Sequence, residues 1–227
     1  MKKNIINYAF LAAALLLPLL LFLGMVFAEE EKVCYITFDD GPTLNTPAIL
    51  KTLENYGAKA TFFVLEERIV QYPDFIKQIY HSKNAIGLHG VSHSEAIYSS
   101  PTAPLEEMNK AGKSLERVIG KGTKLVRVPF GSSYRLTDEM AKNLEDSGYM
   151  IWDWNVDPRD SVGTIIPENV MGNLRRDLER CRETPVILLH DRKSTANLLP
   201  QMLEYLKNEG YQMLPLNEID TPINHLK

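Results

Sequence analysis

The sequence predicts an α/β fold, a single domain built as a deformed or incomplete (β/α) barrel of about seven parallel strands. Apolar, strand-like runs alternate with amphipathic helical stretches about seven times in one continuous series, which is typical of a parallel sheet covered by helices. The length of this repeat suits one barrel better than two domains. With 227 residues, 44% of them hydrophobic, the chain is long enough to close one sizeable core.

The chain begins with an apolar segment that we interpret as a signal peptide or a membrane anchor. Residues 4–28 contain no charge and follow Lys2 and Lys3. The segment exceeds the roughly 7–15 residues of a usual signal-peptide core and is long enough to span a bilayer, so an uncleaved anchor through residues 5–28 is favoured. Either outcome makes the protein extracytoplasmic, membrane-anchored or secreted. The predicted organisation is a signal peptide or anchor over 1–28, a linker over 29–32 and the domain over 33–227.

The sequence gives no indication of nucleic-acid binding or of self-assembly. The chain has 25 basic and 29 acidic residues, and the basic ones are scattered, so no nucleic-acid-binding surface is predicted. No coiled-coil repeat argues for assembly, and a monomer is expected. The two cysteines, Cys34 and Cys181, favour packed thiols over a disulfide, although pairing in an oxidising compartment stays open.

The first half of the domain is predicted to contain three strands and two helices. In order, these are strand 33–38, helix 46–56, strand 60–65, helix 66–80 and strand 85–88. The first helix has the clearest boundaries, because Pro47 stands at its first helical position and Gly57 follows its last apolar residue. The strands are short apolar runs rich in β-branched and aromatic residues.

The second half continues the alternation with four helices and four strands. In order, these are helix 104–119, strand 124–126, helix 137–148, strand 149–152, helix 167–180, strand 185–189, helix 196–208 and strand 211–213. Gly120 closes the first of these helices. Thr137 followed by Asp138 and Glu139 is a capping residue with an acidic first turn, which favours a helix start there.

Polar or ionisable residues stand at the ends of these strands. They are Asp39, Asp40, His89, Arg127, Asp153 and His190. Each has an ordinary structural explanation by itself, such as a capping carboxylate or a buried histidine. In a (β/α) barrel, however, chemistry collects at the carboxyl ends of the strands, so the group together predicts one shared site.

Three of the candidates have the spacing and chemistry of a metal site. His89 and His93 are four residues apart, so both imidazoles can converge on one ion, and Asp40 can supply an oxygen ligand. Two histidines and one carboxylate leave a position open for water, which favours catalytic Zn²⁺, with iron or another divalent ion as alternatives. Asp39 is then the candidate general base and His190 the candidate general acid, which predicts metal-assisted hydrolysis of an acyl bond.

The same residues fall within five ordered motifs. These are Thr37-Phe38-Asp39-Asp40-Gly41, His89-x-x-x-His93, Arg127-x-Pro129-Phe130-Gly131, Trp152-Asp153-Trp154-Asn155-Val156-Asp157 and Leu188-Leu189-His190. In order and spacing they resemble the motifs of the NodB-type polysaccharide deacetylases, carbohydrate esterase family 4. Within that family the chain is similar to exported peptidoglycan N-acetylglucosamine deacetylases.

The resemblance implies further roles. Arg127 would orient Asp39, and Asp153 would orient His190, although Asp157 is an alternative for the latter. The backbone N–H of Phe130 would stabilise the oxyanion, and Trp154 and Leu188 would form a pocket for the acetyl methyl group.

The chain departs from the family pattern at three positions. Gly90 stands where Ser or Thr is usual, Phe130 replaces a frequent tyrosine, and Pro158 follows Asp157 where tryptophan is common. The first departure weakens the expected support of the metal ligands.

The function favoured by the sequence is removal of N-acetyl groups from N-acetylglucosamine units of a cell-wall glycan, either peptidoglycan or a chitooligosaccharide-like chain. An O-acetyl esterase or a muramic-acid deacetylase of the same fold is the nearest alternative. A glycan-binding module without activity is a third, and the retained candidate ligands and catalytic residues argue against it.

Overall fold

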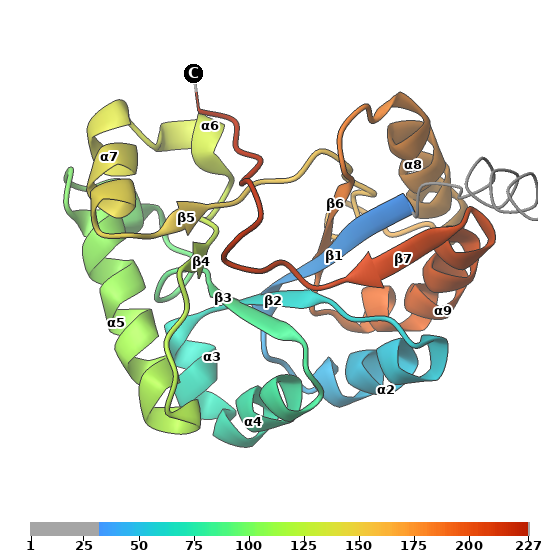
Figure 1. Ribbon diagram of the computed structural model, residues 1–227, viewed down its shortest axis with the longest axis horizontal. Helices are drawn as coiled ribbons and strands as arrows, with labels where there is room; N and C mark the ends of the chain where they lie inside the picture. Colours follow the sequence, from blue (N-terminus) through green and yellow to red (C-terminus); the bar gives the residue numbers. More distant parts are fainter. Residues whose placement is uncertain (1–31, 227) are drawn as a thin grey trace, which may run out of the picture. The chain divides into compact units, whose positions relative to one another are not determined.

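The computed structural model describes residues 32–226, which form a curved sheet with helices packed on its outside (Figure 1). The strands are β1 (Lys32–Gly41), β2 (Thr61–Val64), β3 (Ala85–Leu88), β4 (Leu125–Val126), β5 (Met150–Ile151), β6 (Val186–His190) and β7 (Tyr211–Leu214). Their order in the sheet is β5-β4-β3-β2-β1-β6, with β7 also paired to β1. The pairs along the path from β5 to β6 are all parallel, which confirms the predicted fold class.

One short contact joins the two edges of this curled sheet. The chain leaves β5 and crosses to β6, where Val156 forms an isolated parallel bridge with Ile187. The backbone N–H of Leu188 donates to the carbonyl of Val156 at 2.9 Å. The N–H groups of Asn155 and Val156 also donate to the carbonyl of Val186, so the segment after β5 is held against β6 without forming a strand of its own.

The helices follow the predicted alternation, with one correction. They are α2 (Thr46–Tyr56), α3 (Glu66–Gln71), α4 (Pro73–His81), α5 (Ala103–Ile119), α6 (Ser132–Arg135), α7 (Asp138–Asp146), α8 (Pro167–Arg180) and α9 (Lys193–Asn208), with a 3₁₀ turn over Glu95–Tyr98. The prediction of one helix over 66–80 is wrong. Pro73 lacks an N–H and disfavours helical backbone at Tyr72, which has φ −130° and ψ 56°, so the segment forms two helices.

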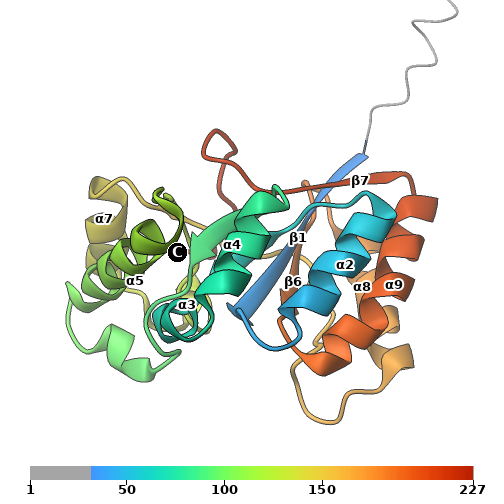
Figure 2. The same cartoon turned by 90° about the horizontal axis from the view of Figure 1, so that it is seen from below.

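The hydrophobic core lies between the sheet and these helices. Phe38 of β1 and Phe62 of β2 stack with their ring centroids 5.0 Å apart. Figures 1 and 2 show α2 and α9 next to each other on one side of the molecule, while α4 and α5 cover β3. Cys34 is buried in this core, which raises the pKa of its thiol to about 12, and both Cys34 and Cys181 are free.

The fold leaves the predicted N-terminal segment untested. The proposed signal peptide or anchor over 1–28 lies outside the described residues. From residue 32 to residue 226, no helix is both long enough and apolar enough to cross a membrane.

Candidate metal and catalytic site

The three predicted metal ligands come together at the carboxyl ends of β1 and β3. Asp40 is near the end of β1, His89 follows β3, and His93 lies in the loop after it. Asp40 Oδ1 is 3.7 Å from Nε2 of His89 and 3.7 Å from Nε2 of His93. One ligating atom from each residue fits within 4.8 Å of the others.

The bonding of these side chains fits a cation. Asp40 Oδ1 is buried and has no hydrogen-bond partner among the described residues. His89 Nδ1 lies 2.7 Å from the carbonyl oxygen of Arg127, so it donates there and leaves Nε2 directed at Asp40. Burial lowers the pKa of His89, which keeps the ring in the neutral form that binds metals. Burial would raise the pKa of Asp40, but its electrostatic interactions with the surrounding histidines and with Arg192 outweigh burial and lower that pKa.

The loop that carries the two histidines is held by a carboxylate from α5. Glu107 Oε2 accepts a hydrogen bond from the N–H of Val91 at 2.8 Å. Gly90 has φ +85°, and a Cβ there would lie 2.9 Å from Glu107 Oε2. Glu107 thus occupies the space that a side chain at position 90 would need, and its carboxylate supports the loop of the metal ligands.

Asp39, the candidate base, lies beside this cluster. Arg127 Nη1 donates to Asp39 Oδ1 at 2.8 Å, and both side chains are buried. The same guanidinium also donates to three oxygens, those of Thr37 (Oγ1), Trp152 (O) and Asp153 (O). Because four of its five N–H groups donate hydrogen bonds, Arg127 has little freedom to turn away from Asp39. Asp39 is the register partner of His190 across β1 and β6, which brings the candidate base and acid together.

The partner of His190 differs from the sequence-based expectation. Its Nδ1 lies 2.8 Å from Asp160 Oδ1, and its backbone N–H donates to Asp160 Oδ2 at 2.8 Å. The prediction that Asp153 or Asp157 orients His190 is therefore wrong. The sequence offers one indication of this partner, because Asp160 is a further carboxylate three residues after Asp157.

Asp160 also changes the protonation of the ring. Burial lowers the pKa of His190, but the hydrogen bond and charge of Asp160, together with Asp39 and Asp40, outweigh it, and the pKa lies above its ordinary 6.5. Ser161 Oγ lies 3.4 Å from Nε2 on the other side of the imidazole.

Asp153 instead holds three chain segments together. Its carboxylate accepts a hydrogen bond from the N–H of Ser132 at 3.0 Å and another from the N–H of His225 at 2.7 Å. The Ser132 hydroxyl donates to it as well. Its own N–H donates to the carbonyl of Ile223 at 2.7 Å. Asp153 thus ties the turn after Phe130 to the C-terminal segment.

The predicted oxyanion and pocket residues lie around the same strand ends. Phe130 has φ +66°, rare for a residue with a side chain, and its ring packs against His93 with centroids 4.5 Å apart. Trp154 packs on Gly131, where a Cβ would come within 3.0 Å of the indole. Leu188 is buried and lies two residues before His190, on the same face of β6.

Asp191 is a further residue that the sequence analysis missed. It follows His190 and accepts hydrogen bonds from the hydroxyls of Thr43 and Thr46 and from the N–H of Thr43. These contacts hold the loop after β1 against the end of β6. Because the loop directly follows Asp39 and Asp40, Asp191 helps to position both.

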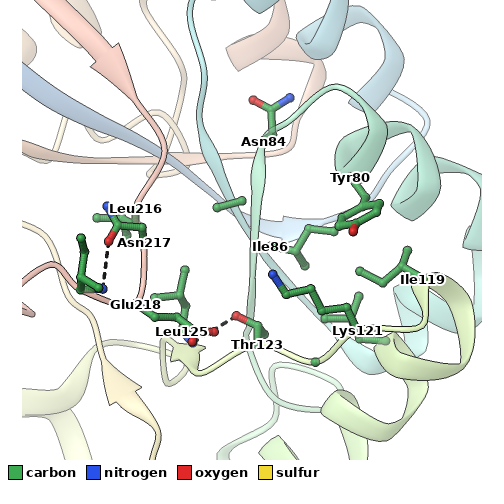
Figure 3. Close-up of a pocket in the computed structure, with 14 residues that line it drawn as sticks. Tyr80, Asn84, Ile86, Ile119, Lys121, Thr123, Leu125, Leu216, Asn217 and Glu218 are labelled. Carbon is green, nitrogen blue, oxygen red and sulfur yellow. Dashed lines mark hydrogen bonds between the residues drawn. The ribbon is translucent and has the colours of Figure 1, made fainter.

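A separate cavity of about 500 Å³ lies at the opposite ends of the strands (Figure 3). It is lined at the starts of β3 and β4, with Ile86 and Leu125 from the sheet and Tyr80 and Lys121 from the surrounding segments. None of the candidate site residues lines it. The cavity therefore belongs to the end of the barrel away from the predicted chemistry.

Comparisons with known proteins agree with this geometry. A family model described as "Polysaccharide deacetylase" matches residues 28–151. YheN of Bacillus subtilis is 36% identical over 198 residues, which cover 86% of this chain and 70% of that protein. A peptidoglycan-N-acetylglucosamine deacetylase of Bacillus cereus is 32% identical over 200 residues, covering 84% of this chain and 71% of that protein.

Solved structures agree as well. The polysaccharide deacetylase Bc1974 of Bacillus cereus superposes with a TM-score of 0.77 at 30% identity, covering 85% of this chain and 96% of that one. The catalytic domain of a peptidoglycan N-acetylglucosamine deacetylase from Eubacterium rectale gives a TM-score of 0.77 at 26% identity, and the match covers 86% of this chain and 94% of that one.

Proposed function

The chain belongs to the polysaccharide deacetylase family, and on this premise we propose that it hydrolyses the N-acetyl groups of N-acetylglucosamine units in cell-wall glycan. The products are acetate and a glucosamine unit. The relatives named as peptidoglycan deacetylases support this substrate. The observation that carries the proposal is that Asp39 and His190 are register partners on the neighbouring strands β1 and β6, beside the cluster of Asp40, His89 and His93. Since peptidoglycan lies outside the cytoplasm, the reaction belongs there.

Asp40, His89 and His93 are the residues that would hold a divalent cation, with Zn²⁺ the best match to two imidazoles and one carboxylate. When bound, such an ion lowers the pKa of water and polarises the acetamide carbonyl group. A membrane anchor over the N-terminal segment would keep the domain next to the wall.

The other side chains divide the proton transfers between them. Asp39, held by Arg127, accepts a proton from the water that attacks the acetamide carbon. His190 has a raised pKa, so it retains a proton that it can donate to the leaving nitrogen, and Asp160 holds its ring in place. The N–H of Phe130 donates to the developing oxyanion, while Trp154 and Leu188 enclose the acetyl methyl group.

Acetate release tests the proposal. The purified full-length protein, supplied with a divalent metal, should release acetate from N-acetylchitooligosaccharides or peptidoglycan. Mass analysis of the digested glycan should show acetyl groups replaced by hydrogen on glucosamine residues. A panel of O-acetylated sugars tests the esterase alternative, and hydrolysis of those alone would contradict the proposal.

The role of Asp39 has its own test. Asp39→Asn should lower kcat by about 10²–10⁴-fold, because it removes the general base, while the bound metal, measured by elemental analysis, is retained. Full turnover in this variant would remove Asp39 from the mechanism. Treatment with a chelator should abolish activity in the wild type, and restored metal should return it.

A further inference from the structure

Three hydrogen bonds hold the loop between the two histidine ligands. The carbonyl of Gly90 accepts from the N–H of Glu66, the first residue of α3, at 3.0 Å. The carbonyl of Val91 accepts from the N–H of Glu67 at 3.2 Å. The N–H of Val91 donates to Glu107 Oε2 of α5 at 2.8 Å. Helices α3 and α5 therefore both hold this short stretch of chain.

The backbone of the loop needs such support. Gly90 has φ +85° and His93 has φ +52°, and both values lie in the left-handed region. Glycine adopts this region freely, whereas a histidine there is strained. Because the sequence of the loop does not favour this conformation by itself, contacts from other elements must stabilise it.

The two histidines differ in how far they depend on the loop. His89 is buried, and its Nδ1 lies 2.7 Å from the carbonyl oxygen of Arg127. Its backbone N–H also donates to the last carbonyl of β2 at 2.9 Å, so the sheet holds this residue. Within the described part of the chain, the ring of His93 makes no hydrogen bond, and it packs edge-on against Phe130. The direction of the His93 ring therefore depends on the loop backbone.

The place of the Glu107 carboxylate is linked to the absence of a side chain at position 90. A Cβ on Gly90 would lie 2.9 Å from Glu107 Oε2 and 3.2 Å from Ile97 Cδ1. The first contact is too short, so one of the two groups would have to move. The carboxylate is at the end of a flexible side chain, and its movement would break the hydrogen bond to Val91.

The next step rests on the proposed function, because it assumes that the site holds a divalent cation. We propose that Glu107 is a positioning residue of the metal centre. Its carboxylate holds the N–H of Val91 and thereby keeps His93 directed at the cation, without serving as a ligand itself. A carboxylate suits this role, since a hydrogen bond to a charged acceptor is stronger than one to a neutral acceptor.

Metal affinity tests the proposal without any substrate. In full-length Glu107→Ala, the Kd for Zn²⁺, measured by competition with a chromophoric chelator, should rise by about 10–100-fold, the usual effect of losing a group that supports a metal ligand. Glu107→Gln keeps an acceptor but not the charge, so its Kd should lie within about fivefold of the wild-type value. An unchanged Kd in Glu107→Ala would overturn the proposal.

Glu106→Ala is the matched control on the same helix. Glu106 is exposed, and its Oε1 accepts a hydrogen bond from Thr102 Oγ1 at 2.7 Å rather than from the loop. This variant should bind Zn²⁺ as the wild type does. A rise in Kd equal to that of Glu107→Ala would mean that the negative charge of α5 matters rather than the hydrogen bond, and the proposal would fail.

The absorption spectrum of bound Co²⁺ separates positioning from a general role in stability. The visible bands of Co²⁺ in place of Zn²⁺ depend on the number and arrangement of its ligands. They should change in Glu107→Ala and return toward the wild-type spectrum in Glu107→Gln. A lower unfolding temperature of the metal-free Glu107→Ala protein with an unchanged Co²⁺ spectrum would contradict the proposal.

A double-mutant cycle tests the link between the two positions. In the wild type, Gly90→Ala displaces the carboxylate and strains the backbone, so the Kd for Zn²⁺ should rise. In Glu107→Ala only the backbone strain remains, and the same substitution should raise the Kd by a smaller factor. Equal factors would contradict the proposal. Absence of Zn²⁺ binding or of acetate release in the wild type would instead contradict the proposed function, so the two failures are distinguishable.

Discussion

Asp153 and Asp160 are two fully buried carboxylates in the irregular segment that follows β5, yet they bind different kinds of group. Asp160 faces the imidazole of His190, a titratable side chain beside the candidate base. Asp153 faces the backbone N–H groups of Ser132 and His225 and joins distant segments of the chain. Asp160 therefore affects the protonation of His190, whereas Asp153 affects the position of the backbone.

The difference shows that burial alone does not identify a catalytic acid. Both residues are inaccessible to solvent, and both lie near the candidate site. What separates them is that Asp160 is hydrogen-bonded to the imidazole of His190, whereas the hydrogen bonds to the Asp153 carboxylate come from two backbone N–H groups and a serine hydroxyl. A hydrogen bond to a titratable ring lets the carboxylate change the pKa of that ring. Variants of the two residues should therefore fail in different measurements.

The largest effect is expected for Asp160→Asn. The neutral amide can accept a hydrogen bond from His190, but it lacks the negative charge that stabilises the protonated imidazole. We expect kcat to fall by about 10²–10⁴-fold, the usual contribution of a positioned general acid. Steady-state acetate release measures this. Asp157→Asn is the matched control, because Asp157 accepts from the N–H of Arg159 rather than from His190. Equal losses in the two variants would contradict the assignment of Asp160.

The pH profile sharpens the same contrast. Because the pKa of His190 is raised above 6.5 in the folded protein, the ring stays protonated above that pH. The stability it contributes is complete below pH 6.5 and is lost as the pH rises through the raised value. Activity that needs the protonated ring should fall over the same range. In Asp160→Asn the alkaline limb of kcat should move to lower pH, and in Asp153→Asn it should not.

Asp153→Asn should mainly lower stability. The neutral amide lacks the negative charge that strengthens the hydrogen bonds from Ser132 and His225. Its NH₂ group also replaces one acceptor oxygen and therefore faces a hydrogen-bond donor of one of these residues. A loss of about 1.5–3 kcal/mol in the free energy of unfolding is expected. Thermal or denaturant unfolding measures it, and kcat should fall only several-fold. A loss of activity as large as that of Asp160→Asn with unchanged stability would reverse the two roles.

The smallest effect is expected for His225→Ala. The side chain places Nε2 2.8 Å from the carbonyl oxygen of Trp154 and Nδ1 3.6 Å from Asp153 Oδ2, and its ring lies edge-on to that of Trp154. The backbone N–H that donates to Asp153 at 2.7 Å is kept in this variant. The free energy of unfolding should fall by about 1 kcal/mol or less. A loss as large as that of Asp153→Asn would mean that the imidazole, rather than the backbone, holds the C-terminal segment.

The regular elements were largely predictable, because each carries its own local signal. Pro47 and Gly57 bound α2, and Thr137 caps α7, accepting from the N–H of Met140. The departures also have local causes, as at Pro73. Strands β4 and β5 each begin one residue later than expected, and β5 also ends one residue earlier.

The sequence by itself determined the candidate cation cluster and the candidate base. Asp39 and Asp40 end one strand, and His89 and His93 share one loop at a spacing of four, so short-range geometry places each pair. The predicted parallel sheet then brings the two pairs to the same end of the barrel. The five motifs also indicated which strand end carries each candidate residue and in which order these strand ends occur along the chain.

Only the tertiary structure decided which carboxylate serves His190 and which arginine stands beside Asp40. The segment from Asp153 to Asp160 has neither the period of a strand nor that of a helix, so no pattern states where its side chains point. Their directions are set by partners 21, 72 and 30 residues away, namely Ser132, His225 and His190. Such contacts exist only once the sheet has curled and brought those segments together.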